Sequence, residues 1–409
     1  MPSWHPLTQT GLRFAVLAAL GRSSRLLGHG QPPPSPLGQR CLLVREDQVG
    51  AVSPGVEVEP LAEPPLRVDT PVMLNDRSDV GEVPCDPATL VRPRRRIRGM
   101  SAILLPFTAG RRIDWDAFAA HVDRTAAAGI TPAVNMDTGY VQLIDDGTRR
   151  EALRIARDTL GPGGELVAGA CVVDATGAGV DEPAYGRQLD MIMSVGGLPV
   201  IFPSFGLTAG GDADFVGRCR RLASRVDRFI GFELSTEFVP SGRVLSLAAY
   251  GELMQIPNCI GAKHSSLSRR LEWQRLALRD RVRPEFHVFT GNDLAIDMVR
   301  YGSDWLLGLS TAAPAAFALR DRWWAEGDCR FDELDDSLQA LGDFAFRRPV
   351  PAYKHSMAQA LHLQGLLASD EPHPDSPRRP DSDREIIATI LDRIDRAVTA
   401  SPFAAPPPV

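Results

Sequence analysis

The chain of 409 residues is 44% hydrophobic and 23% charged, and its formal net charge is −6 at pH 7. No segment approaches the ~20 consecutive apolar residues of a transmembrane helix. The mild negative charge is opposite to the basic footprint of a nucleic-acid-binding protein. This composition predicts a globular protein whose partners are neither membranes nor nucleic acids.

Cysteine and histidine usage gives no sign of a metal site or a disulfide framework. The six cysteines are widely spaced and form no C-x-x-C pair, which indicates reduced thiols and a cytoplasmic location. Residues 11–20 are mainly apolar, but no small-residue cleavage site of a secretory signal follows them. His264 and His287 fall on neighbouring predicted strands, yet no third ligand has suitable spacing. We therefore expect neither a metal nor a cofactor.

Residues 1–97 differ in composition from the rest. The proline-rich stretches at 31–38 and 54–71 interrupt helices. We expect this N-terminal extension to be largely disordered, or at most a small β appendage. The basic run at 92–98 is short and contains a proline, which is more typical of a solvated linker than of a nucleic-acid site.

From residue 98 to residue 330 the pattern becomes regular, with eight apolar, β-rich runs alternating with eight segments of helical periodicity. The apolar runs are 100–105, 131–136, 166–173, 199–202, 229–234, 259–263, 287–290 and 305–309. Continuously apolar strands that alternate with amphipathic helices indicate parallel strands covered on both faces. Eight such units in about 230 residues match a (β/α)8 TIM barrel. A doubly wound open sheet is the alternative, but no G-x-G-x-x-G loop follows the first strand.

The remainder is predicted to be a C-terminal helical segment at 331–400, with helices at 331–346, 352–367 and 383–399. The polar, proline-rich stretch at 371–383 (EPHPDSPRRPDSD) has a disordered composition, as does the tail at 401–409.

Lysine occurs only at Lys263 and Lys354 among 45 basic residues. Arginine supplies charge but cannot act as an amine nucleophile, whereas a desolvated lysine can form a Schiff base with a carbonyl. Lys263 follows a short apolar run at the end of the sixth predicted strand, and barrel active sites lie at the C-terminal strand ends. Its amine is therefore expected to face the barrel mouth, where apolar neighbours lower its pKa. Lys354 begins a late helix, where a structural role is expected.

Five motifs occur in the order found in the dihydrodipicolinate synthase / N-acetylneuraminate lyase family, and from about Gly99 to about Gly365 the chain resembles that family. They are Ala102–Phe107, Met136–Tyr140, Ile260–Ser265, Thr290–Asp293 and Pro351–Lys354. The resemblance implies class I Schiff-base chemistry, a small-molecule 2-oxo-acid substrate and a homo-oligomer.

The resemblance also assigns roles around Lys263, the implied imine-forming residue. We expect Thr138 and the backbone amides of Asp137 to Gly139 to hold the substrate carboxylate, because exposed N–H groups on a tight loop favour anions. Arg243 matches approximately the arginine that binds a carboxylate in part of the family.

The family's tyrosine after the fifth strand, which transfers protons, is absent here. Glu237 falls at its aligned position and is our first choice for this role. Tyr140 is second, and Asp137 and Asp174 are further candidates.

These observations predict a metal-independent lyase, aldolase or hydro-lyase that forms an imine between Lys263 and a 2-oxo-acid such as pyruvate or a sugar-derived keto acid. Two alternatives remain open. The chain could be a non-catalytic ligand-binding or regulatory descendant, as the missing tyrosine suggests, or a barrel enzyme of unrelated mechanism.

Overall fold

The computed structural model describes residues 85–399, so the predictions for residues 1–84 and 400–409 lie outside the described residues. Eight parallel strands close into a barrel in sequence order, β1-β2-β3-β4-β5-β6-β7-β8, and β8 pairs with β1. The predicted (β/α)8 barrel is confirmed, and the open-sheet alternative is excluded because the sheet has no edge. The strands are β1 (Gly99–Ala102), β2 (Thr131–Val134), β3 (Val167–Ala170), β4 (Leu198–Ile201), β5 (Phe229–Leu234), β6 (Cys259–Ser265), β7 (His287–Thr290) and β8 (Asp304–Leu307).

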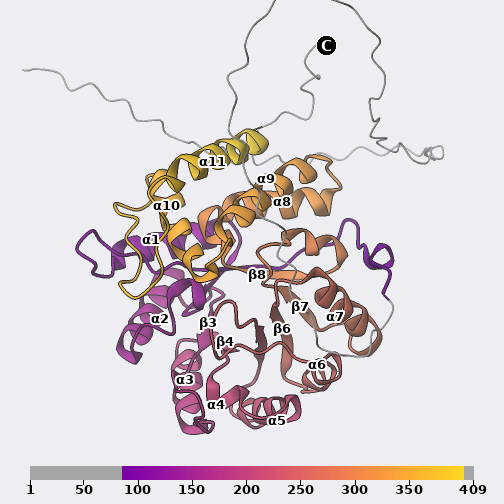
Figure 1. Cartoon of the computed structure of the whole chain (residues 1–409). Coiled ribbons are helices and arrows are strands. Elements are labelled where there is room, and N and C mark those ends of the chain that lie inside the picture. The colour runs from indigo at the N-terminus through magenta and orange to yellow at the C-terminus, as the bar shows by residue number, and fades with distance from the viewer. Residues whose placement is uncertain (1–84, 400–409) are drawn as a thin grey trace, which may run out of the picture. The chain divides into compact units, whose positions relative to one another are not determined.

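Helices surround the strands (Figure 1). They are α1 (Trp115–Ala127), α2 (Asp146–Leu160), α3 (Glu182–Ser194), α4 (Phe205–Thr208), α5 (Asp212–Ala223), α6 (Leu247–Met254), α7 (Arg269–Val282) and α8 (Pro314–Glu326). Between β7 and β8 the chain forms the 3-10 helix η3 (Ile296–Tyr301) where an α-helix is expected. Short 3-10 turns also occur at η1 (Pro87–Leu90), η2 (Asp137–Gly139), η4 (Leu309–Ala312) and η5 (Val350–Ala352).

Local sequence signals explain where the first helices begin. Asp114, Asp145 and Asp181 each precede a helix, and each carboxylate accepts a hydrogen bond from a backbone amide in the first turn. Such caps satisfy amides that have no partner within the helix, and each contributes about 1 kcal/mol. The strands themselves are buried along nearly their whole length, as expected for a parallel sheet covered by helices.

The C-terminal segment forms α9 (Arg330–Ala345), α10 (Tyr353–Leu363) and α11 (Asp383–Thr399). α11 packs against α9 and α10, and α10 lies against η4 at the C-terminal end of β8. The start of α10 is thereby placed at the barrel mouth.

Residues 371–382, which we call the strap, connect α10 to α11, and the expectation that this stretch is disordered is wrong. The Arg379 guanidinium donates to the carbonyl of Ala345 at 2.9 Å, and its backbone amide donates to Nδ1 of His355 at 2.7 Å. The His373 ring packs edge-on against Phe107 at 5.5 Å. Composition misleads here because specific hydrogen bonds, rather than many apolar side chains, fix the strap.

Residues 85–97 of the predicted extension contact the barrel. Leu90 is buried in a small apolar cluster with Leu276 and Val288. In the basic run at 92–98, Arg95 pairs with Asp304 at 2.9 Å, and Arg92 pairs with Asp280. These arginines therefore anchor the chain to the base of the barrel.

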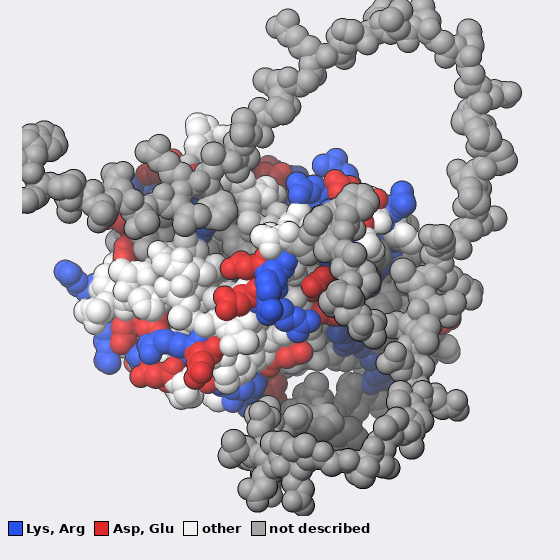
Figure 2. Space-filling model, turned by 90° about the horizontal axis from the view of Figure 1, so that it is seen from above, with Lys and Arg blue, Asp and Glu red and all other residues white. Residues whose placement is uncertain are grey.

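The face seen in Figure 2 carries basic and acidic side chains next to each other rather than in patches of one sign. No helix in the described part of the chain is long and apolar enough to cross a membrane.

Candidate active site

Lys263 lies on β6, between Phe232 of β5 and Phe289 of β7 in the strand register. Its side chain is 5% exposed, and its Nζ lies 4.7 Å from the centre of the Phe232 ring. Burial lowers the pKa of Lys263 to about 8, although the carboxylates of Asp293 and Asp137 act in the opposite direction. About one amine in ten is therefore neutral at pH 7, a far larger fraction than for a solvated lysine.

Gly291, directly after β7, leaves room for the lysine. A Cβ atom at this position would lie 2.5 Å from Cε of Lys263 and 2.1 Å from Oγ of Ser265. Only glycine therefore allows the β7 loop to approach the Lys263 side chain this closely.

The charges of two carboxyl groups raise the pKa of the Lys263 amine. Asp293 follows β7 and is 2% exposed, and its Oδ1 accepts the backbone amide of Leu309 at 2.7 Å. Burial raises the pKa of Asp293 to about 7, although the amide of Leu309 and the charge of Lys263 oppose this rise. A proton can therefore reside on either Asp293 or Lys263 near neutral pH.

Asp137, on the η2 turn after β2, is the second carboxyl group. Lys354 Nζ donates to both of its oxygens, at 3.0 and 2.9 Å, and Gln142 donates at 2.9 Å. The Tyr353 hydroxyl donates to it at 2.8 Å. Burial alone would raise the pKa of Asp137, but the Lys354 charge and these hydrogen bonds lower it. Asp137 is therefore a carboxylate with its acceptor sites occupied.

Tyr353 and Lys354 are site residues that sequence reasoning missed. The Tyr353 hydroxyl lies 2.9 Å from Oγ1 of Thr138, so that Thr138, Tyr353 and Asp137 form a chain of hydrogen bonds. Because Tyr353 gives its single proton to Asp137, Thr138 is the donor to Tyr353. The P-A-Y-K motif was the available signal, but it marked these residues only as the head of a helix.

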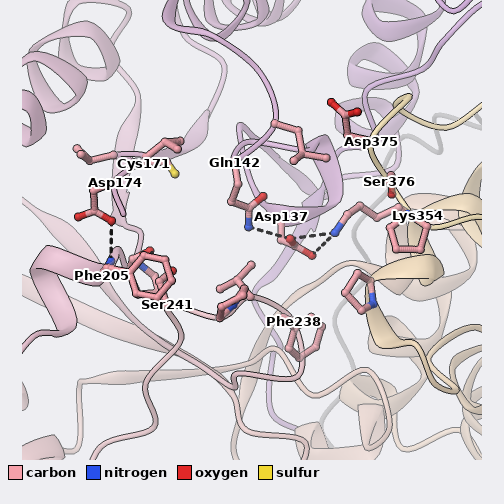
Figure 3. Close-up of a pocket in the computed structure, with 18 residues that line it drawn as sticks. Asp137, Gln142, Cys171, Asp174, Phe205, Phe238, Ser241, Lys354, Asp375 and Ser376 are labelled. Carbon is pink, nitrogen blue, oxygen red and sulfur yellow. Dashed lines mark hydrogen bonds and ion pairs between the residues drawn. The ribbon is translucent and has the colours of Figure 1, made fainter. Parts of the chain in front are cut away.

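A cavity of about 320 Å³ opens at this end of the barrel (Figure 3). Asp137 and Lys354 line its inner part, and Asp375, Ser376 and Pro377 of the strap form one wall. Lys263 does not line the cavity. Asp137 links the cavity to Lys263. It lines the cavity, and its negative charge also raises the pKa of Lys263.

Two other residues expected at the site, Glu237 and Arg243, lie elsewhere. Glu237 accepts a hydrogen bond from Arg348 at 3.1 Å, and its side chain is 32% exposed. Arg243 is held by Asp212 at 2.8 Å and by the Gly210 carbonyl at 2.7 Å. Neither lines the cavity.

Tyr140 is buried, in a left-handed backbone conformation with φ of 58°, and packs edge-on against Phe107. Burial raises the pKa of its hydroxyl above the ordinary value. In the same loop, the Gly139 amide donates to the Met136 carbonyl. Asp174 accepts hydrogen bonds from Ser204, Phe205 and Gly206 at the start of α4.

Comparison with known proteins finds solved structures that share this fold. Neither a protein-family model nor a curated protein matches the sequence. Solved structures do match. One is a prophage protein of the dihydrodipicolinic acid synthase family from E. coli K12 in complex with pyruvate, with 17% identity, a TM-score of 0.64 and coverage of 73% of this chain and 98% of the other.

Two dihydrodipicolinate synthases give similar values. The Thermotoga maritima protein has 16% identity and a TM-score of 0.62, with 74% and 99% of the two chains covered. The Agrobacterium tumefaciens protein has 18% identity and a TM-score of 0.61, with 76% and 100% covered. The chain therefore has the fold of the dihydrodipicolinate synthase family at low sequence identity, and the resemblance seen in the sequence is confirmed at the level of the fold.

Proposed function

We propose that the protein is a class I, metal-independent lyase of the aldolase or hydro-lyase type, in which Lys263 forms an imine with a 2-oxo-acid. The observation that carries this proposal is the buried amine of Lys263, with its pKa lowered to about 8, at the C-terminal end of a barrel strand. The neutral amine attacks the keto carbon, water is lost, and the protonated imine withdraws electrons from the adjacent carbon.

Lys354 is the group that we assign to the substrate carboxylate. An ammonium group has three hydrogen-bond donors, and Asp137 takes two contacts from Lys354, which leaves one for a ligand. Lys354 is also the only cationic side chain among the described residues that line the cavity. Its Nζ lies 2.9 Å from the Asp137 carboxylate, so attack on a keto carbon would require this contact to break.

Tyr353 is the group that we assign to proton transfer, in place of Glu237 or Tyr140. Its hydroxyl bridges Thr138 and the Asp137 carboxylate, so a proton can move along this chain as the carbinolamine forms and loses water. Glu237 instead pairs with Arg348. The homo-oligomer that the family resemblance implies and the cytoplasmic location that the cysteine usage indicates complete the proposal.

Imine trapping tests the assignment directly. The protein would be incubated with pyruvate and borohydride, and its peptides analysed by mass spectrometry. We expect an adduct on Lys263, its loss in Lys263→Arg, and its persistence in the matched control Lys354→Arg. An adduct on Lys354 would overturn the assignment. Trapping without turnover of any carbonyl partner would favour a ligand-binding protein.

A further inference from the structure

The cavity wall that lies away from Lys354 differs in chemistry from the inner end of the cavity, where Lys354 lies. It is mainly apolar, with Val172, Pro203, Phe205, Val239 and Pro240 among its residues. At the rim, Leu143 is 41% exposed and Val173 is 61% exposed. Exposed apolar side chains at a cavity mouth indicate a surface that a ligand covers.

The charged side chains of the cavity lining are three aspartates, Asp137, Asp174 and Asp375, and one lysine, Lys354. Since Asp137 pairs with Lys354, the remaining charge of the lining is negative. A ligand carboxylate placed beyond Lys354 would meet two aspartates and no cation.

Arginines near the cavity mouth do not supply the positive charge that a second carboxylate would need. Arg243 is paired with Asp212 and Arg348 with Glu237. The buried guanidinium of Arg149 donates to the carbonyls of Val141 and Cys171 and to Asp146. Each has partners that it would have to leave before it could bind a ligand.

One polar group of the strap has no such partner. Ser376 lines the cavity and is 6% exposed, and its hydroxyl has no hydrogen-bond partner among the described residues. A buried hydroxyl without a hydrogen-bond partner is unfavourable, and a neutral hydroxyl or carbonyl group of a ligand placed against the strap would satisfy it. Figure 3 shows Ser376 on the strap, across the cavity from Phe205 and Asp174.

We propose that the second reactant, the carbonyl compound joined to or released from the oxo-acid, is an uncharged aldehyde with an apolar body, and that the cavity discriminates against a second carboxylate. This inference rests on the proposed function. Lys354 binds the oxo-acid carboxylate. The apolar wall contacts the body of the aldehyde, and Ser376 forms a hydrogen bond with a neutral polar group on the aldehyde.

The test compares binding of two alcohols that cannot form imines: benzyl alcohol and 4-(hydroxymethyl)benzoate. Ligand-detected NMR on the full chain, with pyruvate present so that Lys354 is already occupied by a carboxylate, would measure their dissociation constants. We expect the neutral alcohol to bind at least about tenfold more tightly, which corresponds to about 1.4 kcal/mol. Val173→Arg places a cation on the exposed rim and should reduce this ratio severalfold, whereas Val173→Gln, a neutral control that also lengthens the side chain, should preserve it.

Equal binding, tighter binding of the carboxylated alcohol, or no binding of either would overturn the inference, as would an unchanged ratio in Val173→Arg. Imine trapping with pyruvate is measured separately. Failure of trapping would count against the proposed function, while the alcohol comparison would still report the chemistry of the cavity.

Discussion

Asp137 and Lys354, 217 residues apart in the sequence, form a buried ion pair in which Lys354 Nζ lies 3.0 and 2.9 Å from the two carboxylate oxygens. Both side chains are about 5% exposed. The pair joins the η2 turn after β2 to the first turn of α10, so it fixes the C-terminal helices on the barrel and at the same time sets the charge of the cavity.

Removing one member of this pair should destabilise the protein strongly. A buried ion pair broken on one side leaves an uncompensated charge, which typically costs about 3–5 kcal/mol. We expect Asp137→Asn and Lys354→Met each to lower the free energy of unfolding by about this amount in urea titrations. The double variant should recover part of the loss, because it leaves neither charge buried. Additive losses would show that the two groups are not coupled.

The rate of imine trapping should rise with pH up to about 8 and then level off, because only the neutral Lys263 amine reacts and its pKa is about 8. Asp293→Asn should move the profile to lower pH, since the Asp293 carboxylate favours the ammonium form of Lys263. Asp343→Asn, at an exposed position on α9, is the matched control and should leave the profile unchanged. A profile that still rises beyond pH 10 would contradict the lowered pKa.

Tyr353→Phe should reduce turnover by about 10²–10⁴-fold, the usual effect of losing a general acid–base group. Trapping of pyruvate on Lys263 should persist, since the amine itself is untouched. Glu237→Gln and Tyr140→Phe serve as comparisons, and steady-state rates of all three variants would be measured together. A larger effect of Glu237→Gln would return the proton-transfer role to the residue that the sequence alignment favoured.

Gly291→Ala should abolish trapping while the barrel remains folded. The added methyl group would lie within 2.5 Å of Lys263 Cε, so the lysine must move away from its present position. Such overpacking costs about 1–3 kcal/mol, which thermal unfolding would report. Gly251→Ala on α6, where the nearest atom is 3.5 Å from the new Cβ, is the control and should keep full trapping.

Glu272, which is buried on α7, should make the stability of the folded protein depend on pH. Burial raises its pKa from 4.5 to about 8, although hydrogen bonds from Ser303 and Thr290 oppose this rise. Between these values the folded protein holds a proton that the unfolded chain releases. The group's contribution to stability therefore falls as pH rises through this window, by up to about 1.4 kcal/mol per pH unit. Glu272→Gln should remove this part of the decline in urea titrations at pH 5 to 8. If the free energy of unfolding changed with pH in the same way in the wild type and in Glu272→Gln, Glu272 could not be protonated in the folded protein.

The barrel could be predicted from the sequence because its signal is local. Eight apolar runs alternate with helical segments, and each run became a strand within a few residues of its predicted bounds. Lys263 could be placed on the sixth strand for the same reason, and active sites of such barrels lie at the C-terminal strand ends.

The partners of Asp137 and Thr138 could not be predicted in the same way. Tyr353 and Lys354 reach Thr138 and Asp137 only because α10 lies against η4, and no sequence periodicity reports such packing. Glu237 was aligned by its distance from neighbouring motifs, but the loop after β5 directs it toward Arg348. The strap was misjudged because proline and charge are typical of disorder, whereas here Arg379 binds the carbonyl end of α9.

The position of the strap and of α10 after the last strand has a consequence for synthesis. A ribosome releases the chain from its N-terminus, and domains fold as their residues become available. All eight strands are therefore complete before Lys354 and Ser376 emerge. Under the proposed function, a nascent chain at that stage has its imine-forming lysine but lacks Lys354 and the outer wall of the cavity. The lysine is thus synthesised before the residues that we propose select its substrates.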